Sequence, residues 1–454
     1  MFKRDPGSFR DPSGTVFYKG DTVYRQINKV YMDSYRRLMD SGLHETLVKQ
    51  RLIIPHKETD EPVEGNGALV IQPKRIPFIS YPYEWCFGQY RAAALAMLRV
   101  QLLALQYGMS LKDASAYNIQ FLNGYAVLID TLSFVPYEEN VPWVAYGQFC
   151  RHFVSPLLLM ARVDSRLNKL MVSHIDGIPL DLADNILRRK SGFFGFWHIH
   201  LHSKAIARHG EDGKKTAKVA KVSKERLIAM VQSMLNYINL LTPKETITEW
   251  GDYYKCTNYS DDAAKIKEEI INSYLEHIGE FKTAWDFGAN DGRYSRLALA
   301  KGGAHVVAFD IDHNAVERNY IDVKRSREPM LPLILDLTAP SPDIGFANIE
   351  RGNIGMRQKP DVIFMLAVIH HLAISNNLPL SLIAHWISRQ CRYVIIEFVP
   401  KEDSQTKLLL QNREDIFTNY NEEGFEAAFL EYFSLVKKQS ITGSCRNLYL
   451  LACK

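Results

Sequence analysis

Three acidic residues in the second half of the chain stand at the ends of short apolar runs. Asp286 lies in Thr283-Ala-Trp-Asp-Phe, Asp310 ends Ala304-His-Val-Val-Ala-Phe-Asp, and Asp336 follows Leu331-Pro-Leu-Ile-Leu. Such continuous apolar runs are typical of strands buried on both faces of a parallel sheet. The carboxyl ends of parallel strands lie along one edge, where open α/β sheets bind their ligands. The pattern therefore predicts three carboxylates around one ligand that carries hydroxyl groups or a positive charge.

The turn after the first of these runs is rich in glycine. Gly288 and Gly292 lack the Cβ atoms that would keep a ligand away from the main chain, and Ala289 and Asn290 lie between them. The spacing D-x-G-x-x-x-G differs from the G-x-G-x-x-G of dinucleotide-binding turns, and Asp291 adds a further carboxylate. A helical pattern follows. The sequence thus predicts a strand, a tight turn and a helix that bind an uncharged or positively charged ligand instead of a pyrophosphate.

Two adjacent histidines, His370 and His371, follow a fourth apolar run that begins at Pro360. A neutral imidazole near pH 7 accepts a proton from a reacting hydroxyl group, which makes the pair candidate catalytic residues. The alternative is that one of the two merely hydrogen-bonds a loop carbonyl. Glu397, near the end of a fifth run, is a second candidate for binding an acceptor. Acceptor chemistry is therefore expected at the same edge of the sheet.

A second constellation lies in the first half of the chain, where a helical pattern is followed by Asp113, Asn118, a hairpin and Asp130. This order resembles the catalytic centre of kinase-like phosphotransferases, in which the first Asp orients the acceptor hydroxyl and the other two residues hold Mg²⁺. The sequence departs from that pattern: Leu111-Lys112 replaces His-Arg, Thr-Leu follows the last Asp, and a glycine-rich phosphate loop is missing. A remnant of phosphotransfer and a purely structural use of these side chains both stay open.

Two further clusters, one of histidines and one of basic residues, give weaker evidence of function. Trp197-His-Ile-His-Leu-His places His198, His200 and His202 two apart, on one face if the segment is extended. Their role stays open, and we predict no metal site because the sequence offers no further carboxylate or thiol ligand that we can assign to them. The run 204–226 contains eight Lys or Arg against three Asp or Glu. A solvated helix or loop is favoured over nucleic-acid contact, since aromatic stacking partners are absent from the run.

Length and composition limit the possible number of domains, the partners and the cellular compartment. A chain of 454 residues is too long for one hydrophobic core of ordinary size, so two or three domains are expected. The formal net charge of +4 is too small to indicate a nucleic-acid partner by itself. Six cysteines without a C-x-x-C pair indicate reduced thiols in a cytoplasm. We find no secretory signal and no apolar run of the ~18 residues that a membrane helix needs. The oligomeric state is not predicted.

These patterns predict two domains of different class. Residues 1–241 are expected to form an α+β domain that contains the kinase-like order of Asp113, Asn118 and Asp130. This domain is expected to recognise the acceptor. Residues 242–262 are expected to be a linker, in which Thr242-Pro243 ends a helix and Tyr259 is the preferred candidate for a lid. Residues 263–454 are expected to form an α/β domain with a doubly wound parallel sheet and an antiparallel strand pair at its end.

The turn and the strand-end acids together resemble the class I S-adenosylmethionine-dependent methyltransferases, which have a Rossmann-like sheet. The resemblance implies that S-adenosylmethionine is the cofactor. It assigns the 288–292 turn to the methionine part, Asp310 to the ribose hydroxyls, and Asp336 with Leu337 to the adenine. Asp286, Ile311 and Leu366 are also expected to bind the cofactor. The Asn/Asp-Pro-Pro-Tyr/Phe segment of enzymes that methylate amines and the catalytic cysteine of cytosine enzymes are absent. The histidine pair therefore favours O-methylation.

Segments from both halves narrow the resemblance. They are Ile79-Ser-Tyr-Pro-Tyr-Glu-Trp, Leu111-Lys-Asp-Ala-Ser-Ala-Tyr-Asn-Ile-Gln-Phe, Ile129-Asp-Thr-Leu-Ser-Phe and Leu366-Ala-Val-Ile-His-His-Leu. This combination is similar to the NoeA-like nodulation proteins of bacteria, which implies a methyltransferase tied to modification of a carbohydrate signal. A carbohydrate or other small-molecule acceptor is the resulting expectation. The alternatives are a bifunctional kinase-methyltransferase, and a methyltransferase whose first domain is a non-catalytic module that binds RNA or protein.

Overall fold

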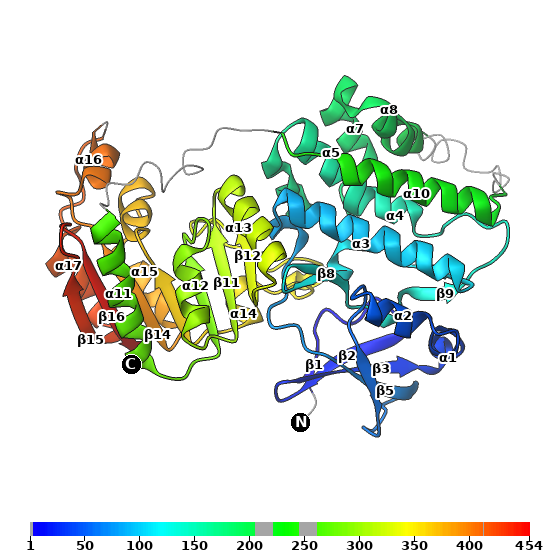
Figure 1. Cartoon of the computed structure of the whole chain (residues 1–454), viewed down its shortest axis with the longest axis horizontal. Helices are drawn as coiled ribbons and strands as arrows, with labels where there is room; N and C mark the ends of the chain where they lie inside the picture. The colour runs from blue at the N-terminus through cyan, green and yellow to red at the C-terminus, as the bar shows by residue number, and fades with distance from the viewer. Residues whose placement is uncertain (1–2, 205–220, 245–260, 412) are drawn as a thin grey trace. The chain divides into compact units, whose positions relative to one another are not determined.

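The computed structural model describes residues 3–204, 221–244, 261–411 and 413–454 (Figure 1). The chain divides into two compact units. Unit 1 consists of Met1–Thr246 with Asp343–Gly352, and unit 2 consists of Ile247–Pro342 with Asn353–Lys454. The 205–220 part of the basic run and the predicted lid residue Tyr259 lie outside the described residues. In the described parts, no helix is long and apolar enough to cross a membrane.

Unit 1 begins with an antiparallel sheet. Its first hairpin joins β2 (Gly14–Lys19) to β3 (Thr22–Asn28), and Gly20 takes the positive φ of 59° that the short turn requires. The complete sheet has the order β1-β2-β3-β5-β4, with β1 at Lys3–Arg4, β4 at His56–Thr59 and β5 at Gly67–Pro73. Two short helices, α1 (Met32–Asp40) and α2 (Leu43–Lys49), stand between β3 and β4.

The rest of unit 1 is built around one long apolar helix, α3 (Phe87–Gln106), most of whose side chains are buried. It packs against α5 (Ser155–Arg162) and α10 (Lys224–Leu240) and against short strand pairs. Those pairs are β6 (Met109–Leu111) with β9 (Phe134–Pro136), and β7 (Ile119–Leu122) with β8 (Tyr125–Leu128). Shorter helices complete the unit: α4 (Tyr146–Phe149), α6 (Leu170–Ser173), α7 (Leu180–Leu187) and α8 (Gly192–Gly195).

A short segment from late in the sequence belongs to unit 1. Residues Asp343–Gly352 leave the strand order of unit 2 and contact the first residues of the chain. Glu350 accepts hydrogen bonds from the Arg10 guanidinium at 2.7 to 3.1 Å, and the Phe346 ring lies 6.1 Å from that of Phe9. Arg351 lies over the ring of Tyr117 at 4.7 Å. No sequence pattern predicts that this segment belongs to unit 1.

Unit 2 contains one sheet of seven strands, with order β12-β11-β10-β13-β14-β16-β15. The first five are parallel to one another, and β16 is antiparallel to both β14 and β15. The predicted doubly wound sheet with an antiparallel end is therefore confirmed. The strands are β10 (Thr283–Phe287), β11 (His305–Asp310), β12 (Met330–Ile334), β13 (Val362–Met365), β14 (Tyr393–Phe398), β15 (Phe433–Ser440) and β16 (Asn447–Cys453).

Helices cover both faces of this sheet. Successive strand residues point to opposite faces, and the apolar residues on each face pack against helices. Ala284 and Val306 belong to a core shared with α11 (Asp261–Ile278), α12 (Arg293–Ala300) and α13 (His313–Ser326). On the other face, the ring of Phe287 lies 5.9 Å from that of Trp386 in α15 (Leu380–Ser388). The remaining helices are α14 (Ile354–Arg357), α16 (Ser404–Leu410) and α17 (Glu422–Leu430). Strand ends are thus held rigidly at one edge.

Candidate functional site

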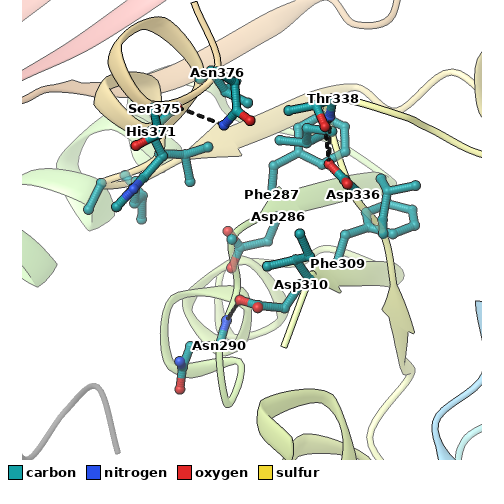
Figure 2. Close-up of a pocket in the computed structure, with 18 of the residues that line it drawn as sticks. Asp286, Phe287, Asn290, Phe309, Asp310, Asp336, Thr338, His371, Ser375 and Asn376 are labelled. Carbon is teal, nitrogen blue, oxygen red and sulfur yellow. Dashed lines mark hydrogen bonds between the residues drawn. The ribbon is translucent and has the colours of Figure 1, made fainter. Parts of the chain in front are cut away.

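A cavity of about 330 Å³ opens at the carboxyl ends of β10, β11, β12 and β13, in the size range of small-ligand sites. Figure 2 shows Asp286, Asn290 and Asp310 at one end of it, Asp336 with Thr338 at a second, and His371, Ser375 and Asn376 at a third. The three strand-end acids therefore meet around one cavity, as the apolar runs predict. The predicted residues that line it are Asp286, Gly288, Asn290, Asp310, Ile311, Asp336, Leu337, Leu366 and His371.

The turn between β10 and α12 is folded tightly over β11. The N–H groups of Gly288 and Ala289 both donate to the Phe309 carbonyl at 2.9 Å. Gly288 has a φ of +74°, and a Cβ there would lie 2.4 Å from Cγ2 of Val368. Both the backbone angle and the space beside Val368 therefore require glycine at this position.

Ala289 and Gly292 are the predicted cofactor residues that the cavity lining lacks. Ala289 is buried and contributes the turn hydrogen bond described above. Gly292 precedes the first residue of α12 with a φ of +82°. Their placement gives both residues a role in shaping the turn.

Asp286 is a buried carboxylate in a cavity wall. It is 2% exposed, and its Oδ2 accepts a hydrogen bond from the Ser295 hydroxyl at 2.6 Å. Burial raises the pKa of Asp286 to about 7, and the nearby Asp310 contributes to the rise. This carboxyl group is therefore poised to ionise near neutral pH, and a cation in the cavity would favour its ionised form.

Asp310 is the second buried carboxylate. Its Oδ2 accepts from the N–H of Asn290 at 2.7 Å, and its Oδ1 accepts from the N–H of Asp312 at 2.8 Å. Burial raises the pKa of Asp310 to about 6, despite these two backbone donors. Two acids that both lose hydration in one cavity make the site unfavourable for an anion and favourable for a cation.

Asp336 is different, since it is partly exposed and lies just after β12. Its Oδ1 accepts from both the N–H and the hydroxyl of Thr338, at 2.8 and 2.6 Å (Figure 2). The cavity lining also contains the apolar side chains of Ile311, Leu337 and Leu366. An apolar lining with a partly exposed carboxylate suits a flat apolar group that has one polar edge.

The two histidines separate in the structure. His371 begins the π-helix η11 (His371–Ser375) and lines the cavity, whereas His370 is 1% exposed and packs behind it with a ring-centroid distance of 4.1 Å. Burial lowers the pKa of His371 to about 4 and holds the pKa of His370 well below its usual range. Both rings are therefore neutral at pH 7 and weakly basic.

Sequence reasoning missed Lys267 of α11, which lines the cavity and is 2% exposed. Its Nζ donates to Oε2 of Glu397 at 2.5 Å, and lies 4.5 Å from the centre of the Tyr294 ring. The available signal was helix periodicity, because Lys267 shares the buried face of α11 with Ala263, Ile270 and Tyr274.

Glu397, the second candidate for acceptor binding, lies outside the cavity lining and is fully buried. Arg446 donates to its Oε1 at 3.2 Å and forms a two-point ion pair with Asp403 at 2.8 and 3.0 Å. Asp403 in turn caps α16 through the N–H of Gln405. A chain of buried ion pairs thus runs from the cavity wall to the start of α16.

The three residues of the kinase-like pattern lie near one another in unit 1. Asp113 accepts from the N–H of Ser115 at 2.9 Å, and burial raises its pKa, with Asp130 as a second cause. Both oxygens of Asp130 have partners within the protein: Leu132 N–H and Arg25 on Oδ1, and the Ser133 hydroxyl on Oδ2. Asp130 is therefore an ion-paired cap of the short 3-10 helix η4 (Thr131–Ser133), which is a structural use of this side chain.

The three alternating histidines are helical, so they do not share one strand face. His198 lies 2.8 Å from the Tyr146 hydroxyl, His202 stacks on the same ring, and His200 pairs with Asp184 at 2.7 Å. Among the described residues, no group of three or more His, Cys, Asp or Glu is arranged to hold a metal ion. These histidines therefore act as packing and hydrogen-bonding groups.

Gly288→Ala should destabilise unit 2 for two separable reasons, backbone strain and the clash with Val368. We expect Gly288→Ala to lower the free energy of unfolding by at least about 2 kcal/mol. Val368→Ala removes the clashing Cγ2, so the double variant should be more stable than the sum of the two single effects predicts, with about 1 kcal/mol of backbone strain left. Denaturant unfolding of all four proteins measures this coupling, and strict additivity would contradict the proposed clash.

Comparison with known proteins finds a relative across the whole chain. No protein-family model matches. The sequence is 32% identical over 463 residues to the nodulation protein NoeA of Rhizobium meliloti (strain 1021), an alignment that covers 98% of this chain and 95% of that protein.

Similar solved structures cover a little under half of the chain. The N-methyltransferase NodS of Bradyrhizobium japonicum WM9 has 11% identity over 43% of this chain and 98% of its own, with a TM-score of 0.32. The magnesium protoporphyrin IX methyltransferase of Synechocystis PCC 6803 with bound S-adenosylhomocysteine has 16% identity over 45% and 93%, with a TM-score of 0.31. These neighbours are S-adenosylmethionine-dependent methyltransferases. On the extent of the first alignment, the chain belongs to the family of the nodulation protein NoeA.

Proposed function

We propose that unit 2 is an S-adenosylmethionine-dependent methyltransferase. The observation that carries this proposal is the meeting of Asp286, Asp310 and Asp336 around one cavity, beside a glycine turn and at the ends of three adjacent parallel strands. A sulfonium nucleoside has the features that such a cavity favours: a positive charge, ribose hydroxyls and a flat base. The buried acids are unfavourable for the phosphates of a dinucleotide.

The cofactor is proposed to lie along the three ends of the cavity. The ribose hydroxyls would donate to Asp310, and the adenine would lie between Ile311, Leu337 and Leu366 with its amino group toward Asp336. The sulfonium and its amino acid part would lie by Asp286, Gly288 and Asn290. The methyl group then points toward the remaining end, where His371, Ser375 and Asn376 gather.

Methyl transfer would occur in line from the sulfonium sulfur to an acceptor oxygen held at that end. The bound cofactor would supply an activated methyl group on a sulfonium that becomes a neutral thioether, and the acceptor hydroxyl would lose its proton. His371, neutral at pH 7, accepts the hydrogen bond of that hydroxyl and passes the proton to water. Because its pKa is low, most of the rate would come from alignment of the three reacting atoms instead of from strong base catalysis.

The acceptor is proposed to be a carbohydrate or another hydroxyl-bearing small molecule. The groups at the acceptor end are uncharged: the neutral ring of His371, the hydroxyl of Ser375 and the amide of Asn376. Asn376 is oriented by a hydrogen bond from its Nδ2 to the His371 carbonyl at 2.9 Å (Figure 2). Neutral donors and acceptors of this kind match hydroxyl groups better than they match an anionic or cationic acceptor.

Cofactor affinity should rise with pH. Asp286 and Asp310 are partly protonated below their pKa values of about 7 and about 6, and S-adenosylmethionine favours the ionised acids. Calorimetry should therefore show binding about tenfold weaker at pH 6 than at pH 8, with a plateau above pH 7 and proton release below it. Asp310→Asn should weaken binding and move the remaining pH dependence to lower pH, because it removes one cause of the raised pKa of Asp286.

The control for that experiment is Asp322→Asn, an exposed acid on α13, which should leave both the affinity and its pH profile unchanged. Absence of binding by the wild-type protein at pH 8 would overturn the proposed function. Binding that does not vary between pH 6 and pH 8 would overturn the role of the two buried acids.

His371→Ala should separate binding from turnover. The cavity keeps its acids, so affinity for the cofactor should change less than threefold, while transfer of a labelled methyl group into a lysate of the producing organism should fall by about ten- to a hundredfold. A matched variant, His385→Ala on α15, alters a histidine away from the cavity and should retain full transfer. Equal loss of cofactor binding and transfer in His371→Ala would contradict an acceptor-side role.

A second candidate function is nucleotide binding by unit 1. It is favoured by the proximity of Asp113, Asn118 and Asp130, since both the Asn118 side chain and Asp130 act on the carboxyl group of Asp113. The ion pair between Arg25 and Asp130 opposes it, because the guanidinium lies where a divalent cation would need the carboxylate.

The melting temperature with ATP and Mg²⁺ decides between these alternatives. We expect no shift for the wild-type protein, since Arg25 already neutralises Asp130. A Mg²⁺-dependent rise of several degrees that Asn118→Ala and Asp130→Asn abolish would establish the kinase-like alternative instead. Asp113→Asn is the companion variant, as it would reduce phosphoryl transfer while leaving nucleotide binding in place.

A further inference from the structure

Three exposed aromatic side chains lie together on one helix of unit 1. Residues 192–204 are helical and include α8 and the π-helix η8 (Phe196–His200). Phe193 is 80% exposed, Phe196 43% and Trp197 52%. The Trp197 ring meets the other two edge to face, with centroids 5.9 Å from that of Phe193 and 6.2 Å from that of Phe196. These three side chains, the aromatic cluster, therefore form one continuous apolar surface.

The opposite side of the same helix is fixed to the rest of unit 1. The Phe194 ring stacks on that of Tyr237 in α10 with 3.8 Å between centroids, and Ile199 is fully buried. His198 lies 4.3 Å from the Phe194 ring and 2.8 Å from the Tyr146 hydroxyl. Figure 1 shows α8 and the strands β1, β2, β3 and β5 on opposite sides of α3. The packing of the inner side thus holds the aromatic cluster outward, away from the core.

The aromatic cluster is unusual for the surface of this protein. Among the described residues, five Phe or Trp side chains are exposed, and three of them form the cluster. The other two, Phe9 and Phe346, contact each other. Single exposed apolar side chains are normal on a protein surface, but a group of neighbouring aromatic rings in water indicates an interaction site.

Basic residues stand on both sides of the aromatic cluster in the sequence. From Arg188 to Lys204 the chain contains four Lys or Arg and no Asp or Glu. The exposed ones are Arg188, Lys190 and Lys204. The adjacent helix α7 has two acids, Asp181 and Asp184, and Asp184 pairs with His200 at 2.7 Å. The surroundings of the cluster therefore have a surplus of positive charge.

We propose that the aromatic cluster and its basic neighbours dock unit 1 on an anionic membrane surface. Aromatic side chains, Trp in particular, enter the boundary between lipid headgroups and acyl chains. Lysine and arginine stay at the level of the headgroups, where anionic lipids attract them. A helix that is anchored on its inner side and carries both kinds of group lies in the plane of that boundary. This docking is independent of the proposed function of unit 2.

A lipid surface fits these side chains better than a nucleic acid or a protein does. Nucleobases stack on open ring faces, whereas His200 stacks on the Phe196 ring at 5.3 Å and the rings of the cluster contact one another through their edges. The centre of a protein interface is depleted in charged residues, lysine above all. An anionic membrane accepts aromatic and basic groups side by side, which is the combination found here.

Sedimentation of the purified protein with lipid vesicles tests the docking. We compare vesicles of phosphatidylcholine alone with vesicles in which about one third of the lipid is phosphatidylglycerol, and expect binding to the anionic vesicles to be at least about tenfold tighter. Raising the salt concentration to about 0.5 M should remove most of that difference, because it screens the attraction. Trp197 leaves water on docking, so its fluorescence emission should shift to shorter wavelength.

Variants of the aromatic cluster test the insertion of the rings. Phe193→Ser and Trp197→Ser should each weaken binding to anionic vesicles by about tenfold and melt near the wild-type temperature, because both side chains are exposed. Trp197→Phe should bind within about threefold of the wild-type protein and lose the emission shift. The matched control is Val30→Ser in η1 (Lys29–Tyr31), a side chain that is 77% exposed, and it should bind as the wild type does.

Variants of the basic residues test the attraction and leave the rings in place. Arg188→Gln combined with Lys190→Gln should weaken binding to anionic vesicles by about tenfold or more and leave binding to phosphatidylcholine unchanged. Lys49→Gln, which removes an exposed lysine paired with Glu45 on α2, is the matched control and should have no effect.

Four results would overturn the proposal. The first is a wild-type protein that binds neither kind of vesicle, and the second is one that binds both equally. The third is concentration-dependent self-association that Phe193→Ser abolishes while vesicles stay unbound, which would assign the cluster to a second copy of the chain. The fourth is salt-sensitive retention on single-stranded RNA with the same dependence on Phe193, which would assign it to a nucleic acid.

Discussion

Two buried carboxylates dominate the electrostatics of the cavity in unit 2. Asp286 and Asp310 come from neighbouring parallel strands, and the fold holds both almost completely buried. Hydrogen bonds compensate them only in part: the hydroxyl and N–H of Ser295 for Asp286, and the N–H groups of Asn290, Ile311 and Asp312 for Asp310. Because these hydrogen bonds do not replace all the lost hydration, the pKa values of both carboxyl groups are raised. A further cation in the cavity would favour the ionised forms of both acids, and glycine at position 288 lets the turn pack against Val368 beside them.

The chain of buried ion pairs places charges of both signs next to this cavity. Lys267, Glu397, Arg446 and Asp403 connect α11, the end of β14, the start of β16 and the first turn of α16. The segments they join are far apart in the sequence, and burial makes each charge depend on its neighbour. Leu409 of α16 also lines the cavity and α16 contacts η11, so the chain of ion pairs links Lys267 to a helix beside His371.

Local sequence patterns were sufficient for the sheet and for the acid edge, because apolar runs, a glycine turn and strand-end acids are all short-range signals. They were insufficient wherever a role depends on a distant partner. Lys267 reads as an ordinary helix residue until Glu397, 130 positions later, is placed against it. The histidine pair looks symmetrical in sequence, and only the π-helix at His371 turns one ring to the cavity and the other inward. The docking of Asp343–Gly352 in unit 1 likewise depends on Arg10 and Tyr117, both more than two hundred residues away.

The low basicity of His371 is compatible with the chemistry because the donor is already activated. A sulfonium gives up its methyl group to a neutral oxygen without prior removal of a proton, since the proton becomes strongly acidic only as the O–C bond forms. A base with a pKa of about 4 then suffices, provided that it accepts the hydrogen bond that fixes the oxygen in line. The burial that weakens this imidazole as a base also keeps it uncharged beside a cationic cofactor, where an imidazolium would repel the sulfonium. In the proposed function, the acids that would attract the cofactor and the neutral ring that would face its methyl group are therefore two parts of one charge arrangement.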